Sequence, residues 1–420
     1  MDWRYFDAAK DQDQEHAARI WHEIGWLDRT NGQALRGMEA YTTSGRGYVS
    51  TVHSNPACFV FEASGTFRYL DDDLSFSGIT GVATDRSGRK QGLALQLTAR
   101  ALMESAESGA AIAGLSTFEQ GFYDRLGFGT GAYEHLWRFD PARLTVSDKV
   151  RPPHHLTVSD VEALHDARLG RARFHGAVTL DQEGQTRSTM LRAPNGFGLG
   201  YYDDGVETPS HGLWCGTQDT ARGPYVIEFL VWKTSEQFLE LMGLIKQWGD
   251  QVRLVCMSEP AGIQLQDLMD RPSQHFFSTA GGNYGSGCRV HANFQYRMLD
   301  LKACIAATHL ACSPLAFNLE LHDPMSGWSH ATKSYSDEVP WPGLGGDYQV
   351  TVGPESEIAQ GTDKSLPVLR ASVGAFSRMW LGVQPASGLA ITDDLNGPPA
   401  LLQALGRAFR LPAPRTDWQY

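Results

Sequence analysis

Residues 81–97, with the sequence GVATDRSGRKQGLALQL, restrict the fold of this 420-residue chain more than any other stretch. A short apolar run comes first, polar and small residues follow, and the lone Gly92 stands directly before an apolar pattern of helical spacing. In that pattern Leu93, Leu97 and Ala101 fall on one face of a helix that we expect over residues 93–108. The order predicts a buried strand, a turn and an amphipathic helix, which is typical of an α/β fold.

The rest of the chain divides into segments at two stretches that favour linkers. One is the polar stretch around Pro152 and Pro153, and the other is the glycine-rich stretch 279–287. We expect domains of residues 1–150, 151–295 and 296–420, the first two of α/β and the third of α+β type. The expected strands are 57–63, 74–84, 111–117, 225–232, 252–258, 317–323 and 347–353, and the expected helices are 16–27, 93–108, 234–249 and 397–409.

Charge and cysteine usage exclude several classes of protein. The formal net charge of -12 argues against a nucleic-acid-binding protein, which needs a basic face. An acidic surface attracts cationic substrates, although it is also ordinary for a globular protein. None of the six cysteines has CxxC spacing or stands beside a His pair, so we expect reduced thiols and no metal or redox site. Without a signal peptide or a long apolar run, we expect a cytoplasmic protein that does not bind membranes.

The start of the helix at Gly92 has the features of an anion-binding site. The first N–H groups of a helix have no partner within it and carry about half a positive charge. Gly92 lacks a Cβ atom, so an anion can approach the backbone, and Arg89 and Lys90 add full charges. The stretch suits a pyrophosphate, although a solvated basic turn before an ordinary helix explains the same residues. Its spacing is neither a P-loop nor GxGxxG.

The second segment repeats the strand–helix–strand order without the basic glycine turn. Its helix begins with a capping box of Thr234 and Gln237, and the sequence KTSEQF at its start contains no glycine. We therefore expect a copy of the first plan that cannot bind a phosphate.

Two motifs resemble a known superfamily. The spacing Arg89-x-x-Gly92-x-Ala94 after a strand resembles the acetyl-CoA pyrophosphate loop of the GCN5-related N-acetyltransferases (GNAT), and residues 118–131, FEQGFYDRLGFGTG, resemble their later helix with a tyrosine followed by Gly-Phe. The three-part order, with YRMLDLKACIAA opening the third part, is similar to the Eis (enhanced intracellular survival) family. LRASVGAFSRMWLGVQP and GLAITDD resemble that family's sterol-carrier-like domain. The resemblance implies two tandem acyl-CoA N-acyltransferase (GNAT) folds followed by an SCP2-like α+β domain.

The resemblance also implies the parts of the site for acetyl-CoA. The strand before the loop splays in this superfamily, and its backbone amides face the pantetheine and thioester. The family prefers an apolar residue where Thr84 stands, which is a departure of this sequence. The residues expected to bind acetyl-CoA are Val82, Ala83, Thr84, Arg89, Lys90, Gln91, Gly92, Leu93 and Ala94.

Two tyrosines are the expected catalytic residues. Tyr123 would be the general acid, because a phenol with an ordinary pKa near 10 is protonated at neutral pH; a packed core tyrosine is the alternative. In the Eis family the C-terminal carboxylate enters the active site as the base, and here it belongs to Tyr420. The aromatic ending DWQY after the stiff LPAP favours a docked terminus, since a free one is usually polar.

The first helix and the residues after it offer candidates for the acceptor pocket. Aromatic rings and carboxylates suit a cationic amine, although an amphipathic helix with an acidic edge explains the same residues. We expect acetylation of an aminoglycoside, a polyamine or a lysine side chain, by a homo-oligomer that the resemblance implies to be a hexamer. The alternatives are a lysine acetyltransferase for one protein or peptide, and a non-catalytic protein that binds acyl-CoA or a lipid. The acceptor residues expected are Trp21, Glu23, Trp26 and Asp28.

Overall fold

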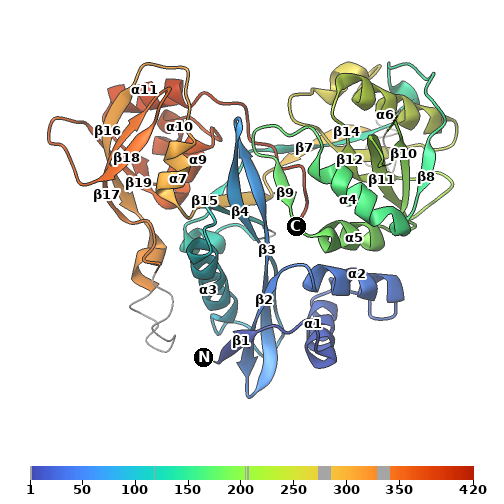
Figure 1. Cartoon of the computed structure of the whole chain (residues 1–420), viewed down its shortest axis with the longest axis horizontal. Helices are drawn as coiled ribbons and strands as arrows, with labels where there is room; N and C mark the ends of the chain where they lie inside the picture. The colour runs from blue at the N-terminus through green and yellow to red at the C-terminus, as the bar shows by residue number, and fades with distance from the viewer. Residues whose placement is uncertain (1, 118, 204, 206–207, 273–284, 329–340) are drawn as a thin grey trace.

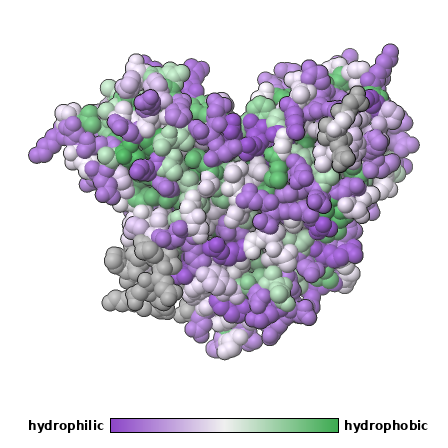
Figure 2. Space-filling view, viewed as in Figure 1, coloured by the Kyte–Doolittle hydropathy of each residue, from purple (hydrophilic) through white to green (hydrophobic). Residues whose placement is uncertain are grey.

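The computed structural model describes residues 2–117, 119–203, 205, 208–272, 285–328 and 341–420. Its three β-sheets form three lobes, with the first sheet at the centre and bottom of Figure 1, the second at the right and the third at the left. The C-terminus lies at the centre, where the lobes meet (Figure 1). Hydrophilic residues cover most of the face seen in Figure 2. Within the described ranges, no helix is both long and apolar enough to cross a membrane.

The first sheet has the strand order β1-β2-β3-β4-β5-β15-β6, and β9 also pairs with β3. Its neighbours are antiparallel except for β4 and β5, a parallel pair that helix α3 (Leu93–Glu107) connects. The strands are β1 (Trp3–Tyr5), β2 (Arg46–Val52), β3 (Asn55–Tyr69), β4 (Asp72–Thr84), β5 (Ile112–Ser116), β6 (Gly129–Thr130), β9 (Val178–Leu180) and β15 (Phe294–Met298).

Helices cover both faces of the first sheet. Cys58 and Val60 of β3 pack in one hydrophobic cluster with α3. Phe59 and Phe61 point to the opposite face, since side chains alternate along a strand, and pack with Trp21 of α1. Helices α1 (Asp11–Glu23) and α2 (Gly32–Thr42) connect β1 to β2. The buried side of α3 carries Leu93, Leu97 and Ala101, as the sequence predicted.

The second sheet repeats this plan. Its order is β8-β10-β11-β12-β13-β7-β14, again with one parallel pair, β12 and β13, connected by helix α6 (Ser235–Gln247). Helices α4 (Val161–Leu169) and α5 (Glu183–Arg192) connect β8 to β10, as α1 and α2 connect β1 to β2. The strands are β7 (Glu134–Phe139), β8 (His154–Leu156), β10 (Phe197–Tyr201), β11 (His211–Thr217), β12 (Tyr225–Val231), β13 (Val255–Ser258) and β14 (Gly287–His291).

The two sheets exchange strands, and the boundaries expected at residues 150 and 295 therefore do not coincide with the sheets. β7 precedes residue 150 but pairs with β13 and β14 of the second sheet. β15 spans residue 295 and pairs with β5 and β6 of the first sheet. Local composition marks linkers but carries no record of which distant edge a strand pairs with. The expected linker contains β8, and most of the stretch 279–287 lies outside the described residues.

The third lobe is an α+β unit with the sheet order β18-β17-β16-β19-β20. Phe317, Leu319 and Leu321 are buried in its core, which makes these strands part of an ordinary packed core. Its strands are β16 (Leu315–His322), β17 (Gly346–Val352), β18 (Glu357–Gln360), β19 (Val368–Ser372) and β20 (Leu395–Asn396), and its helices are α7 (Leu301–Ala306), α9 (Val373–Trp380), α10 (Ala386–Thr392) and α11 (Pro399–Ala408).

The C-terminal tail, residues 411–420, leaves the third lobe and docks between the first two. The Arg171 guanidinium grips the Asp417 carboxylate with two hydrogen bonds of 2.7 Å. Trp418 is 1% exposed, and the Arg168 guanidinium lies 3.5 Å from the centre of its ring. The backbone N–H of Arg415 donates to the carbonyl of His175 at 2.9 Å. The expectation that two aromatics at the end of the chain favour docking agrees with this arrangement.

The strand exchange predicts that residues 1–150 alone do not fold. Without β15, the facing edges of β5 and β6 have no partner, and an unpaired strand edge favours aggregation. We expect the isolated fragment to show no cooperative thermal transition by circular dichroism, whereas the whole chain shows one. A fragment that unfolds as cooperatively as the whole chain would contradict the strand exchange.

Replacing Asp417 with alanine should release the tail. The bidentate ion pair contributes about 1.5 kcal/mol, so carboxypeptidase should remove Tyr420 about tenfold faster. The matched control is Glu320→Ala, because the Glu320 carboxylate is 37% exposed, against 35% for Asp417, and pairs at 2.5 Å with Arg370 of the neighbouring strand β19 in the third lobe. Equal release rates for the two variants would show that this ion pair does not hold the tail.

Candidate active site

Strands β4 and β5 separate at the centre of the first sheet. Their pairing ends at Ile79 and Leu115, while β4 continues to Thr84. The register between β3 and β4 shifts in this region, and Gly81 has φ +59°, a backbone conformation that favours glycine. The edge of β4 beyond Ile79 is therefore left without a partner strand on the β5 side among the described residues. Such an opening exposes backbone groups to a ligand, and Thr80, Gly81 and Val82 line a cavity of 620 Å³ there.

The turn after β4 leads directly into the start of α3. The Asp85 carboxylate accepts hydrogen bonds from the Gly88 N–H at 2.9 Å and the Ser87 hydroxyl at 2.7 Å, and pairs with Arg19 at 3.2 Å. Gly92 is the N-cap of α3 with φ +77°, and it gives the helix no side-chain cap. The first N–H groups of α3 are thus available to an anion.

Two cations lie beside this helix start. Arg89 and Lys90 are exposed, and neither forms an ion pair with another residue in the described part of the chain. A Cβ atom added at Gly92 would lie 3.3 Å from the Gln96 amide nitrogen, so a side chain there would narrow the approach to the helix. The side-chain amide of Gln91 donates to the backbone carbonyl of Ser87 at 2.7 Å, so it is bonded within the turn. The residues Arg89 to Ala94 therefore have the charge and backbone geometry that a pyrophosphate needs.

The hydroxyl of Thr84 has a structural partner. It donates to the Cys58 sulfur at 3.2 Å across the β3–β4 pair. Burial raises the pKa of the Cys58 thiol to about 12, so the sulfur stays protonated. A hydrogen bond to a buried neighbour explains how this strand accepts a threonine where the superfamily prefers an apolar residue.

Tyr123 lines the same cavity as the open edge of β4. It begins a short 3₁₀ helix, Tyr123–Leu126, where the resemblance implied a helix that carries the tyrosine. Phe118 of that motif lies outside the described residues. The Tyr123 hydroxyl has no hydrogen-bond partner within the described residues. Burial is the largest cause that raises the pKa of Tyr123 above its ordinary value, and the negative charge of Glu119 adds to it, so the phenol stays protonated across the physiological range.

Tyr420, the last residue of the sequence, also lines this cavity. Its ring lies over the glycine pair of β4 and β5: a Cβ atom at Gly114 would be 2.6 Å from the Tyr420 hydroxyl, and one at Gly78 would be 3.1 Å from its ring. Phe76 and Phe294 contact the ring from the side. Gly78 and Gly114, which pair with each other across β4 and β5, have no side chains and so leave the space that the Tyr420 ring occupies.

The carboxyl group of Glu134 lies close enough to Tyr420 and Tyr296 for its charge to act on their hydroxyls. Burial raises the pKa of Glu134 to about 7, while the positive charge of Arg415 and hydrogen bonds from Asn293 oppose the shift. The charge of Glu134 in turn helps to raise the pKa of the Tyr420 and Tyr296 hydroxyls. Sequence reasoning did not single out Glu134, whose neighbours come from distant parts of the chain.

The expected acceptor residues divide into two groups. Trp21 and Trp26 line the cavity, and the indole N–H of Trp21 has no hydrogen-bond partner among the described residues. Glu23 lies outside the cavity lining and accepts a hydrogen bond from the Arg86 N–H at 2.6 Å. Asp28 also lies outside it, and its carboxylate accepts from the hydroxyl and N–H of Thr30. The two carboxylates expected to bind the acceptor thus organise turns.

The cavity instead takes its carboxylate from the second lobe. Glu228 of β12 lines it and forms no hydrogen bond or ion pair with another described residue. Burial raises the pKa of Glu228, and the positive charge of Arg192, which also lines the cavity, opposes this. The signal in the sequence was one acidic residue inside the apolar strand YVIEFLVW. The other polar lining residues are Tyr41, Thr80, Ser116, Thr117, Gln185, Ser188, Thr189, Asn293 and Gln419.

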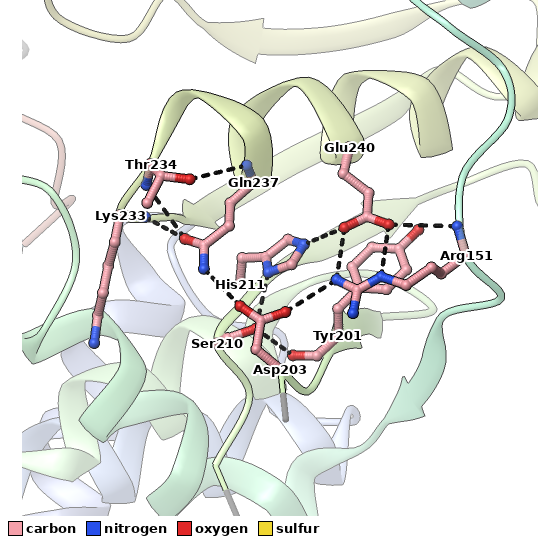
Figure 3. Close-up of polar contacts among 9 residues, drawn as sticks. All are labelled: Arg151, Tyr201, Asp203, Ser210, His211, Lys233, Thr234, Gln237 and Glu240. Atoms are coloured by element: carbon pink, nitrogen blue, oxygen red, sulfur yellow. Dashed lines mark hydrogen bonds and ion pairs between the residues drawn. The ribbon is translucent and has the colours of Figure 1, made fainter. Parts of the chain in front are cut away.

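The start of α6, which corresponds to the start of α3, is closed by side chains (Figure 3). Thr234 and Gln237 form the capping box that the sequence predicted. The Gln237 amide donates to the Asp203 carboxylate at 3.0 Å, and Arg151 pairs with both Asp203 and Glu240. Internal caps and carboxylates at this position disfavour a phosphate, in contrast to the basic turn at Gly92.

Comparisons with known proteins agree with this geometry. Residues 66–131, which contain β4, α3 and β5, match the family model for the acetyltransferase (GNAT) domain. Among solved structures, the chain is similar to a GCN5-related N-acetyltransferase from Anabaena variabilis (14% identity, TM-score 0.77), to another from Kribbella flavida (18%, 0.72) and to Eis1 from Mycobacterium abscessus (15%, 0.74), with 100% of each chain covered. A search of curated proteins found no match.

Because the sequence identities to the solved structures are low, these structures show the fold alone. The family model identifies an acetyltransferase domain in the first lobe. Among the described residues, no group of three or more His, Cys, Asp or Glu side chains could hold a metal ion. The chain carries a GNAT acetyltransferase domain, a kind of domain that uses acetyl-CoA as acyl donor and an amine as acceptor, and the protein is an enzyme of the acyltransferase class.

Proposed function

We propose that the protein is an acetyl-CoA-dependent N-acetyltransferase of the Eis type that acts on a cationic amine. The observation that carries this proposal is the meeting of Tyr123 and Tyr420 at one cavity, beside the open edge of β4. The two residues lie far apart in the sequence, and the tail needs a buried tryptophan and a buried arginine to bring Tyr420 there. Convergence of distant polar groups on one cavity is typical of an active site.

Acetyl-CoA fits the residues present. The first N–H groups of α3 and the Arg89 and Lys90 side chains would hold its pyrophosphate. The open edge of β4 at Val82, Ala83 and Thr84 would hold the pantetheine and orient the thioester by backbone hydrogen bonds, which need no reorganisation during the reaction. When bound, acetyl-CoA supplies an activated acetyl group.

The two tyrosines then divide the proton transfers between them. The Tyr123 hydroxyl stays protonated at neutral pH, so it can hydrogen-bond to the leaving thiolate and pass its proton to it. Because the thiol, with an ordinary pKa near 8.5, is the stronger acid, the hydrogen bond to the developing negative charge is the main contribution, and water returns the proton to the phenol. The C-terminal carboxylate of Tyr420 orients the amine and accepts its proton, directly or through water. This carboxylate is a weak base, so its main contribution is the position of the amine.

The acceptor side favours a cationic amine. Glu228 offers a carboxylate without a protein partner, and such a group is expensive to bury unless a ligand pairs with it. The rings of Trp21 and Trp26 suit an ammonium group, and the unpaired Trp21 N–H and Ser188 hydroxyl suit polar atoms of the acceptor. An aminoglycoside, a polyamine or a lysine side chain meets these requirements.

The same proposal covers the other two lobes. The repeated strand order supports a tandem pair of GNAT folds, of which the second lacks the loop for acetyl-CoA. We take the third lobe to be the SCP2-like domain that donates the C-terminus to the active site. By the resemblance to the Eis family, we also expect a homo-oligomer, namely a hexamer, in the cytoplasm.

Gly92→Ala should weaken acetyl-CoA binding. The new methyl group narrows the approach to the first N–H groups of α3, so we expect the KM for acetyl-CoA to rise about tenfold. Gly109→Ala at the other end of α3 is the control, because Gly109 has φ +90° and a Cβ atom there meets nothing within 4 Å. If both variants keep the KM of the unchanged enzyme, the pyrophosphate does not bind at Gly92.

Tyr123→Phe should lower kcat about 100-fold or more without changing the KM for acetyl-CoA, since only the proton donor is lost. Tyr41→Phe serves as control, because Tyr41 lines the cavity and bonds the Thr80 hydroxyl but has no proposed proton transfer. Thiol release from acetyl-CoA is the measurement.

Two residues added after Tyr420 should abolish turnover, measured by the same thiol release, while the fold is kept. Full turnover with that extension would overturn the role of the terminal carboxylate.

Glu228→Gln should raise the KM for a polyamine about tenfold and leave the KM for acetyl-CoA unchanged, because a neutral amide cannot neutralise an ammonium. The test uses an untagged chain and a panel of aminoglycosides, polyamines and lysine peptides. Activity with one peptide alone would favour the lysine acetyltransferase. Measurable acetyl-CoA binding without turnover on any acceptor would favour a binding protein instead.

A further inference from the structure

We propose that the opening between β12 and β13 of the second lobe is a second ligand site, which takes a small aromatic carboxylate and controls the C-terminal tail. The two strands pair only at Tyr225–Val255 and Val226–Cys256, after which β12 continues to Val231. A cavity of 390 Å³ lies at this divergence. Its place in the second sheet corresponds to the place of the β4–β5 opening in the first.

The ligand of this opening carries no pyrophosphate. The start of α6 is capped by Thr234 and Gln237, and the neighbouring Asp203 and Glu240 carboxylates are fixed by Arg151 (Figure 3). A nucleotide would place its phosphates against these groups. The second lobe thus keeps the divergence of the two strands but lacks the phosphate-binding turn. The opening therefore suits a ligand smaller than a nucleotide.

The lining combines aromatic rings with a cation. Trp137, Phe174 and Trp232 line the cavity, and the Phe174 and Trp232 rings lie 5.9 Å apart. Phe174 is 41% exposed and Val226 is 40% exposed, which leaves apolar surface for a ligand to cover. Arg289 of β14 also lines the cavity and forms no ion pair or hydrogen bond with another described side chain. An aromatic ring between the apolar side chains and a carboxylate on Arg289 would use both features.

Two of the three acidic side chains of the lining, Asp417 and Glu259, are paired within the protein, so they do not repel such an anion as free carboxylates would. Asp417 is neutralised by Arg171, and Glu259 accepts hydrogen bonds from the Trp137 indole N–H and the Leu265 backbone N–H. Glu228 lies in the wall that this cavity shares with the active-site cavity, as Gln419 does.

The same lining links the opening to Tyr420. Thr416, Asp417 and Gln419 of the tail line the cavity, together with Arg171, which holds the tail. A ligand that contacts these residues binds the docked tail more tightly than a released one. By linkage it shifts the population toward the docked state, in which Tyr420 lies in the active site.

Binding can be tested on the full chain with the fluorescent probe 8-anilinonaphthalene-1-sulfonate, an aromatic anion. We expect the affinity for the probe to fall at least tenfold in Arg289→Glu and in Phe174→Ser, and to remain unchanged in the control Arg222→Glu, an exposed arginine outside the lining. 2-Naphthoate should displace the probe, and neutral 2-naphthalenemethanol and coenzyme A should not. Equal affinity in all variants, or displacement by coenzyme A, would overturn the proposed site.

The link to the tail has its own readout. Saturating 2-naphthoate should slow the release of Tyr420 by carboxypeptidase at least threefold in the unchanged chain and have no effect in Arg289→Glu. Release at the same rate with and without the bound carboxylate would refute the control of the tail. Neither measurement uses acetyl transfer, so a failure here is distinct from a failure of the proposed enzyme activity.

Discussion

Strand β15 is the element on which the arrangement of all three lobes depends. It completes the first sheet between β5 and β6, although the chain reaches it from β14 of the second sheet. Its Arg297 side chain, fully buried, pairs at 2.8 Å with the fully buried Asp323 of the third lobe and also donates to the carbonyl of Leu126. Loss of one partner of such a pair costs about 3–5 kcal/mol, so this contact fixes the third lobe against the first.

The active-site cavity follows from that arrangement. Its walls come from α1, α2 and β4 of the first lobe and from α5 and β12 of the second, so neither lobe forms it alone. The third lobe contributes the tail, which crosses the second lobe through Arg171 and Trp418 before Tyr420 enters the cavity. Tyr123 of the first lobe and the terminal Tyr420, which lie far apart in the sequence, thus meet at one cavity.

Signals within short stretches predicted the local structure well. The strand, turn and helix around Gly92 were predicted from spacing and charge, and the capping box at Thr234 was predicted from four residues. The docking of the tail was predicted from two aromatics at the chain end, and Trp418 is indeed buried. The roles of Tyr123 and Tyr420 remain predictions, because geometry places them at the cavity without testing their chemistry.

Features that depend on distant parts of the chain could not be predicted in the same way. The strand exchange involves edges whose pairing has no local signal, so the boundaries at 150 and 295 missed it. Glu23 and Asp28 have the right chemistry for an acceptor site, but both lie outside the cavity lining. Glu23 bonds the N–H of Arg86, which is distant in the sequence, and Asp28 bonds its neighbour Thr30. Glu228 reaches the cavity because the two lobes pack against each other, which the sequence of its strand cannot show.

The most direct test of the central claim is a crystal structure of the chain with coenzyme A and a polyamine. The account predicts the pyrophosphate at the first N–H groups of α3, the thiol beside the Tyr123 hydroxyl at the β4–β5 opening, and the amine between Glu228 and the carboxylate of Tyr420. Coenzyme A bound at the β12–β13 opening, or a thiol remote from Tyr123, would contradict it.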